Sequence, residues 1–182
     1  MKTLITTIIV TIFPLVLNTQ DNEALCNYIS KELKEKPILC IDKSKINANN
    51  EIYQFYKWTA FKDDYFVRIE KNNNNYFLVQ KKMTKHHYNQ ETGEEYEAKI
   101  EIIVNRKLSK VEILNFKKII GESKIWENSN YHVEPICNDG WGIFVYAIKK
   151  NNFIELDNGS CSPKDEFLNN IYDKLKISFN LK

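Results

Sequence analysis

Apolar residues recur along this chain at two spacings, one typical of helices and the other of strands. Helical spacing first occurs in Asn22–Lys36. Its apolar face carries Leu25, Ile29 and Leu33, and Pro37 follows as a stop signal. We therefore predict a short amphipathic helix near the start of the folded chain.

The segment Ser109–Ile120 has the clearest helix signals. Ser109 and Glu112 form the S-x-x-E pattern of a capping box, in which each side chain bonds the other residue's backbone N–H. Gly121 follows as the predicted C-terminal stop. The pattern therefore predicts a helix with defined ends.

A third helix is predicted for Ser162–Lys176, with Ser162 as the N-cap and Pro163 at the first helical position. Its apolar stripe consists of Phe167, Leu168, Ile171, Tyr172 and Leu175. A stripe this wide has to be buried against another element, so we expect this helix to pack on a sheet.

Strand signals occur in six segments that are rich in aromatic and β-branched residues and are separated by turn residues. They are Ile52–Phe61, Tyr65–Glu70, Tyr76–Lys82, Tyr96–Val104, Gly142–Ile148 and Phe153–Leu156. The run Asn72–Asn75 tolerates left-handed backbone and predicts a hairpin turn, and Lys149–Asn152 predicts another. The polar segment Met83–Glu95 is expected to be an exposed loop.

The order of these elements predicts an α+β fold. Sequential strands favour an antiparallel sheet, here of about five to six strands, with two or three helices packed mainly on one face. Alternation in Tyr96–Val104 predicts that Ala98, Ile100 and Ile102 face the core. No linker interrupts the chain, so residues 20–182 are expected to form a single domain.

The first strand is aromatic on both faces. Tyr53, Phe55 and Phe61 alternate onto one side, which we assign to the core. Tyr56 and Trp58 lie on the other side, where they are either buried under the first helix or exposed. If they are exposed near Arg68 of the next strand, the three residues form an aromatic and cationic patch of the kind that anchors protein partners.

The N-terminal residues 1–19 have the pattern of a signal peptide. Lys2 is followed by the apolar run Leu4–Leu17, which ends at polar residues before Gln20. A run of about 14 residues suits a signal-peptide core better than a membrane anchor, which needs about 20. We expect an exported protein, periplasmic or extracellular, without a membrane span in its mature form.

The four cysteines, Cys26, Cys40, Cys137 and Cys161, follow this leader. An even number of cysteines in an exported chain favours disulfides over zinc, since no C-x-x-C pair is present. Four cysteines allow three pairings. The predicted turn at Pro37 and the last hairpin favour Cys26–Cys40 and Cys137–Cys161.

Charge and motif spacing narrow the function classes. The chain has 26 Lys and Arg against 24 Asp and Glu, a net charge of +2, so no strong field attracts nucleic acid. His86 and His87 stand near Glu91, but these residues lack metal-ligand spacing, so we predict neither a metal site nor a cofactor. Gly159–Pro163 departs from the nucleophile-elbow pattern, and we assign no catalytic residue.

Several short motifs between Glu51 and Leu175 carry a resemblance. They are Tyr53-Gln54-Phe55, Val67-Arg68-Ile69-Glu70, the helix before Trp126, Asp139-Gly140 before a hairpin, and Ser162-Pro163. In these motifs the chain resembles a group of small exported bacterial proteins of unknown function. The resemblance implies export and the α+β fold, and it implies no activity.

The leading functional hypothesis is therefore a non-catalytic binding protein, such as an inhibitor or an immunity-like partner of another protein. The alternative is a small hydrolase whose site assembles from distant segments. A cleft that gathers His132 with Glu134 or Asp139 would favour the hydrolase. A flat aromatic patch would favour binding to a protein.

We predict that the exported protein begins near Gln20 and is soluble without detergent. The short apolar run and its polar exit are the physical reasons, because a cleaved leader leaves no anchor behind. N-terminal sequencing of the protein recovered outside the cytoplasm measures this. A first residue of Met1 would contradict the prediction.

Overall fold

The computed structural model describes residues 26–36, 38–40, 51–60, 62–85, 87–88, 93, 95–128, 131–133, 140–158 and 166–182. They belong to two compact units, Met1–Cys40 and Ile41–Lys182. The predicted signal peptide, Phe61, Cys137, Cys161 and the predicted start of the third helix at Ser162 lie outside the described residues.

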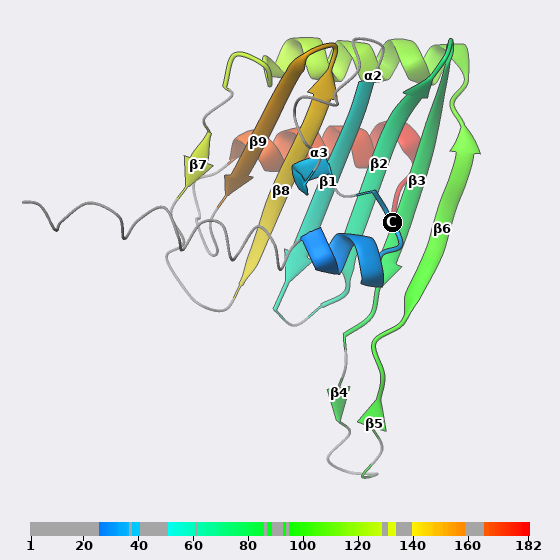
Figure 1. The fold of residues 1–182 in the computed structure, drawn as a ribbon, viewed down its shortest axis with the longest axis vertical. Helices are drawn as coiled ribbons and strands as arrows, with labels where there is room; N and C mark the ends of the chain where they lie inside the picture. Colours follow the sequence, from blue (N-terminus) through cyan, green and yellow to red (C-terminus); the bar gives the residue numbers. More distant parts are fainter. Residues whose placement is uncertain are drawn as a thin grey trace, which may run out of the picture. The chain divides into compact units, whose positions relative to one another are not determined.

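The larger unit has the predicted α+β fold, built on one sheet (Figure 1). Six long strands pair antiparallel in the order β6-β3-β2-β1-β8-β9. Their bounds are β1 Glu51–Thr59, β2 Asp64–Asn72, β3 Asn75–Met83, β6 Ile100–Lys107, β8 Trp141–Lys149 and β9 Asn152–Asn158. The two-residue strand β7, His132–Val133, adds to β9 in parallel.

Turn chemistry fixes the two tight hairpins as the sequence predicted. Asn72 pairs with Asn75 across the β2–β3 turn, and Asn73 has a left-handed φ of 55°. Lys149 pairs with Asn152 in the β8–β9 turn, where Lys150 also has a φ of 55°. Asparagine tolerates this backbone better than most residues, which explains the strength of the first signal.

Two helices, α2 (Lys110–Ser123) and α3 (Glu166–Phe179), cover the same face of the sheet (Figure 1). Below, this side is called the helix face. Alternation along β1 turns Tyr53 and Phe55 to this side, where they join Val145 and Leu175 in one buried cluster. The first strand therefore has the core side that its sequence predicted.

Helix α2 begins with the predicted capping box. Ser109 Oγ accepts a hydrogen bond from the Glu112 backbone N–H at 3.3 Å, and the Glu112 carboxylate accepts one from the Ser109 N–H at 2.8 Å. The predicted stop at Gly121 is wrong, because the helix runs on to Ser123 and ends at Lys124, which has a φ of 51°. Gly121 stays helical, so the left-handed turn comes three residues later.

The predicted loop Met83–Glu95 contains a short strand that sequence analysis missed. β4 (His87–Tyr88) pairs antiparallel with β5 (Glu95–Tyr96). Two-residue strands have too few positions to show an alternating pattern, which is why the polar composition concealed them.

Strand β6 differs most from its prediction. Ile100 and Ile102, expected in the core, are 38% and 62% exposed. The register shifts between Gln80 and Lys81 of β3, so Ile103 has no partner and Val104 turns to the helix face instead. A bulge of this kind reverses which residues face inward, and alternation alone does not reveal it.

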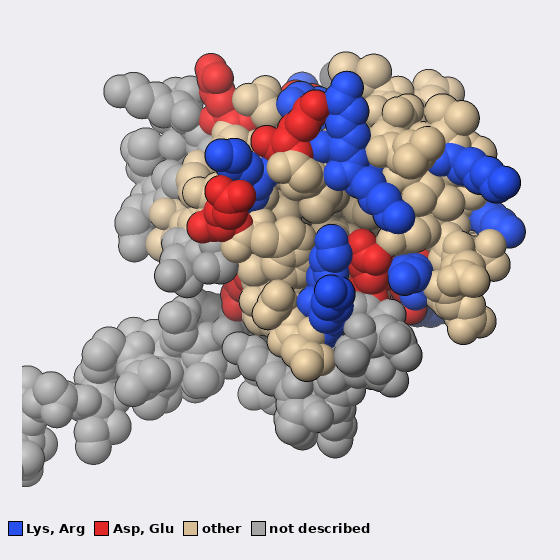
Figure 2. All heavy atoms as spheres, turned by 90° about the horizontal axis from the view of Figure 1, so that it is seen from above, with Lys and Arg blue, Asp and Glu red and all other residues tan. Residues whose placement is uncertain are grey.

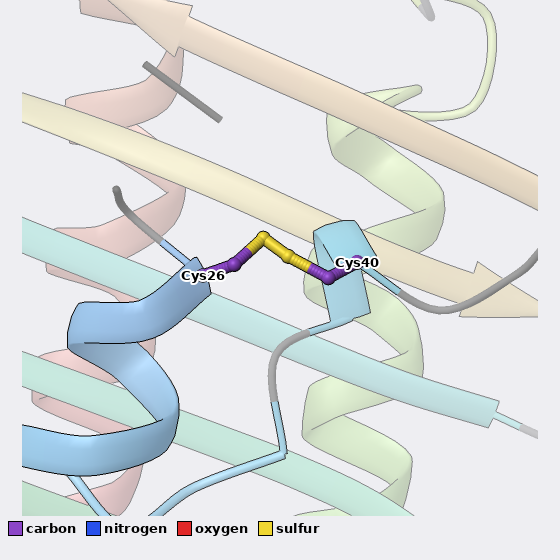
Figure 3. Close-up of a disulfide and its surroundings, with 2 residues drawn as sticks. All are labelled: Cys26 and Cys40. Atoms are coloured by element: carbon purple, nitrogen blue, oxygen red, sulfur yellow. A yellow bond between two sulfur atoms is a disulfide. The ribbon is translucent and has the colours of Figure 1, made fainter. Parts of the chain in front are cut away.

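The N-terminal unit holds a short π-helical turn, η1 (Tyr28–Glu32), and a 3-10 turn, η2 (Ile38–Cys40). The predicted helix to Lys36 is too long, because the backbone leaves the helical form after Glu32 and Lys34 has a φ of 51°. A disulfide joins Cys26 to Cys40, with their Cα atoms 6.0 Å apart (Figure 3). It closes a short loop, which restricts the unfolded chain.

We expect Glu112→Gln to flatten the acid dependence of stability. Arg106 holds the pKa of Glu112 down at about 2, against an ordinary 4.5. A lowered folded pKa gives stability that is present above the ordinary value and is lost as the pH falls through the folded value. Urea unfolding is measured from neutral pH down to pH ~2. The free energy of unfolding of wild type should exceed that of the variant at neutral pH, and the difference should shrink below about pH 4.5.

Ser109→Ala is the matched control for this prediction. It removes the cap without removing the charge, and it should cost about 1 kcal/mol at neutral pH. Glutamine can still complete a capping box, so Glu112→Gln isolates the charge. Parallel stability curves for wild type and Glu112→Gln across the acid range would contradict the assignment.

Candidate functional site

The predicted patch of Tyr56, Trp58 and Arg68 lies on the face of the sheet opposite α2 and α3. Tyr56 is only 8% exposed, and its hydroxyl donates to Asp64 Oδ2 at 2.9 Å. Its ring stacks on Phe144, with centroids 6.3 Å apart. The polar end of Tyr56 is thus engaged within its own chain.

Asp64 is the buried carboxylate that organises this corner of the sheet, and sequence analysis did not identify it. It is 2% exposed and also accepts from the Thr59 backbone N–H at 2.8 Å and from Lys85 Nζ at 2.6 Å. Three donors from β1 and the strand ends therefore converge on one side chain. A buried carboxylate needs such compensation to remain charged.

Trp58 and Arg68 are half-buried, and both have neighbours on the sheet. Trp58 lies directly across from Gly142, where an added Cβ would come within 2.3 Å of the indole Nε1. Glycine is therefore required at 142 by the indole that covers it. Arg68 forms an ion pair with Glu70, which is two residues further along β2.

The helix face holds a hollow alongside α3, here called the α3 cavity. Its volume is about 940 Å³, within the range of small-molecule sites. It is lined by residues from β1, β2, β8, α3 and the C-terminal end, namely Lys57, Thr59, Lys62, Asp63, Tyr65, Gly140, Trp141, Asn169, Tyr172, Lys176 and Lys182. Segments far apart in the sequence thus build one wall.

Lys57 and Tyr172 lie next to each other in the lining of the α3 cavity. The Lys57 ammonium stands over the Tyr172 ring, 5.1 Å from its centroid. Burial lowers the pKa of Lys57, while the charge of Asp173 opposes that effect. Tyr172 is 2% exposed and its pKa is raised by burial, so its hydroxyl stays protonated.

The Tyr172 hydroxyl has no hydrogen-bond partner among the described residues. A buried hydroxyl without a partner costs free energy, commonly 1–3 kcal/mol. Such a group in a native structure calls for a partner that the chain itself does not supply. Tyr172 also lines the α3 cavity, although its hydroxyl oxygen is itself buried.

Positive charge dominates the α3 cavity. Four lysines line it, and the one aspartate in the lining, Asp63, already pairs with Lys82 Nζ at 2.8 Å. In the described part of the chain, no carboxylate lies within ion-pair distance of Lys57 or Lys176. The cavity therefore favours an anion over a cation.

A second hollow, the α2 cavity, lies at the other end of the helix face and has a volume of about 490 Å³. At its base the Glu51 carboxylate accepts from the Tyr76 hydroxyl at 2.6 Å and from the Tyr53 hydroxyl at 3.4 Å. Burial and the neighbouring Glu51 raise the pKa of both phenols. The Phe116 ring packs edge-on against the Tyr53 ring, with the two ring centroids 5.0 Å apart.

Lysines also stand around the α2 cavity, namely Lys71, Lys117, Lys124 and Lys149. Figure 2 views this end of the sheet and shows cationic side chains gathered there with carboxylates between them. Lys124 reaches Glu127 at 3.9 Å, and Lys117 lies 5.6 Å from the Tyr76 ring. The tyrosine hydroxyls here already have an acceptor in Glu51, whereas the buried Trp126 Nε1 has no hydrogen-bond partner among the described residues.

The histidine named for the hydrolase hypothesis has a carboxylate partner. His132 Nδ1 lies 2.6 Å from Asp157 Oδ1, across the β7–β9 pair. The His132 side chain is 54% exposed and lines neither cavity. Glu134 and Asp139 lie outside the described residues.

Among the described residues, no three His, Cys, Asp or Glu side chains lie together in a way that could hold a metal ion. Within the same residues, no helix is both long enough and apolar enough to cross a bilayer.

The α3 cavity could have been found in the sequence by following alternation further along β1. Tyr53 and Phe55 were assigned to the core side, and the next positions on that side are Lys57 and Thr59. A lysine that continues a core-facing row is a signal for a site. Its partner Tyr172 was not recognised as a site residue, because in the sequence it belongs to an ordinary apolar helix stripe.

Comparisons with known proteins add no family. No protein-family model matches the chain, and no curated protein matches it. The resemblance to small exported bacterial proteins therefore stays a prediction.

Replacing Asp64 by alanine should destabilise the protein by about 3 kcal/mol, because it leaves Tyr56 and Lys85 without their acceptor. Asp63→Ala is the matched control, since Asp63 makes only a surface pair worth less than about 1 kcal/mol. Urea unfolding at neutral pH measures both. An equal loss in the free energy of unfolding for the two variants would show that Asp64 does not organise this corner of the sheet.

Proposed function

We propose that this chain is an exported, non-catalytic binding protein whose α3 cavity holds a small organic anion with a flat, unsaturated body. The single observation that carries the proposal is the lining of this cavity by four lysines, with the buried, unpartnered hydroxyl of Tyr172 behind it.

Two kinds of group in the lining select such a ligand. Lys57 and Lys176 attract a carboxylate, sulfonate or phosphate, and Lys57 lies deep enough for its charge to be weakly screened. The aromatic rings of Tyr65 and Trp141 provide surfaces for a planar body. Ligand sites commonly combine apolar surfaces with a few polar groups that fix orientation.

Tyr172 and Lys57 favour a binding role over a catalytic one. The Tyr172 hydroxyl stays protonated because burial raises its pKa, so it acts as a hydrogen-bond donor. Burial lowers the pKa of Lys57, and an anion beside it would raise that pKa again. Both residues therefore gain from a bound anion without any bond being made or broken.

The alternative in which the protein binds another protein rests on Tyr56, Trp58 and Arg68. The hydroxyl of Tyr56 and the guanidinium of Arg68 are engaged within the chain, which leaves the half-buried Trp58 as the main anchor. The α3 cavity combines four lysines with a volume of about 940 Å³, so we favour it. Export remains part of the proposal and rests on the N-terminal leader pattern.

We expect the full mature chain to bind 1-anilinonaphthalene-8-sulfonate at one site, and to bind the uncharged N-phenyl-1-naphthylamine about tenfold more weakly or less. The two dyes differ in the sulfonate, so their comparison measures anion selection. Lys57→Met should weaken sulfonate binding by about tenfold and leave the neutral dye unchanged. Fluorescence titration of the folded protein is the measurement.

Tyr172→Phe and Lys110→Met sharpen the test. Tyr172→Phe removes a hydroxyl that has no partner, so the melting temperature should hold or rise while sulfonate binding weakens by about twofold to tenfold. Lys110→Met removes a lysine outside the cavity and should change neither dye. Equal affinity for both dyes, or no effect of Lys57→Met, would overturn the anion site.

A further inference from the structure

Strand β6 forms an open edge of the sheet. It pairs with β3 on one side, and among the described residues no strand pairs with its other side. At eight residues it is long enough to bind a further strand, whereas the opposite edge strand β7 has only two residues. An edge of this length exposes a row of backbone N–H and C=O groups that can pair with another chain.

The face of the sheet beside this edge carries exposed apolar side chains. Ile102 is 62% exposed and Ile100 38% exposed on β6, and Phe77 of the adjacent strand β3 is 37% exposed. The bulge at Ile103 turns both β6 isoleucines away from the helix face. Exposed apolar residues on an open edge favour association, whereas protected edges usually place charges there.

Charge is distributed unevenly along β6. Glu101 stands near its start, and Arg106 and Lys107 stand at its end. An antiparallel neighbour with the same sequence would place its acidic start beside this basic end. Opposite charges on facing strands stabilise a pair, and like charges destabilise it. The strand is thus complementary to its own reversed copy.

We infer that β6 pairs antiparallel with β6 of a second copy of this chain, so that the two sheets continue into each other across a two-fold axis. The two-fold axis passes beside Val104, so Val104 of one copy faces Val104 of the other. Because Ile103 is bulged, Ile102 then faces Asn105 of the second copy. Glu101 faces Arg106 on the helix side of the joined sheet.

This arrangement keeps the contacts that Arg106 already makes. Its guanidinium binds the Glu112 carboxylate through two contacts, at 2.6 and 3.0 Å. Arginine has five N–H donors, so it can hold Glu112 and still face Glu101 of the second copy. The capping box of α2 therefore does not have to open when the copies pair.

Sedimentation equilibrium of the mature chain over a wide concentration range tests the inference. We expect a reversible dimer, and we expect Ile102→Lys to weaken it by about tenfold or more because a lysine at this edge opposes pairing. Ile177→Lys is the matched control, because Ile177 is 83% exposed and belongs to α3 and not to β6. It should leave the dimer unchanged.

A charge exchange makes the test specific to the proposed register. Glu101→Lys alone should be monomeric, since its new charge would face Arg106. Arg106→Glu combined with Glu112→Lys should also be monomeric, while the reversed internal pair preserves the fold. An equimolar mixture of the two variants should form a heterodimer, because both facing pairs are then opposite in charge.

A wild type that stays monomeric at the highest concentration would overturn the inference. So would equal behaviour of Ile102→Lys and Ile177→Lys. Failure of the mixed variants to form a heterodimer while wild type dimerises would place the interface elsewhere and overturn the β6 pairing. Circular dichroism of each variant confirms that it is folded before it is compared.

Discussion

Strand β1 lies between β2 and β8 and is paired along its length with both, so its alternation decides what each face of the sheet presents. Tyr53 and Phe55 enter the core under the helices. The next residue in that row is Lys57, which the apolar core cannot accommodate without a polar environment. The apolar row of β1 therefore ends before Lys57, and the α3 cavity lies at this point of the helix face.

The fold was largely predictable because its signals are local. The capping box at Ser109, the asparagine turn after β2 and the alternation in β1 each depend on a few adjacent residues, and the structure contains all three. The inward face of β6 was not predictable, because it depends on a bulge against β3 that no short segment encodes. The helix end at Lys124 was missed because glycine at 121 permits a left-handed turn without requiring one.

The candidate site was less predictable than the fold, for a different reason. Its members come from β1, β8, α3 and the C-terminal end, and only the folded chain brings them together. Tyr172 has the sequence context of an ordinary core residue, and only its missing hydrogen-bond partner distinguishes it. Asp64 likewise becomes important through two donors from β1 and a third, Lys85, that follows β3. Polar groups of this kind are defined by their partners, and sequence spacing does not show those partners.

The three tryptophans of the chain lie in three different surroundings. Trp141 lines the α3 cavity, Trp126 lines the α2 cavity, and Trp58 covers Gly142 on the opposite face of the sheet. Indole emission responds to local polarity and to nearby quenching groups, so each ring reports on a separate region of the molecule. The protein thus carries an intrinsic optical label at each cavity and one at the sheet surface, and single-tryptophan versions would resolve events at one place from events at the others.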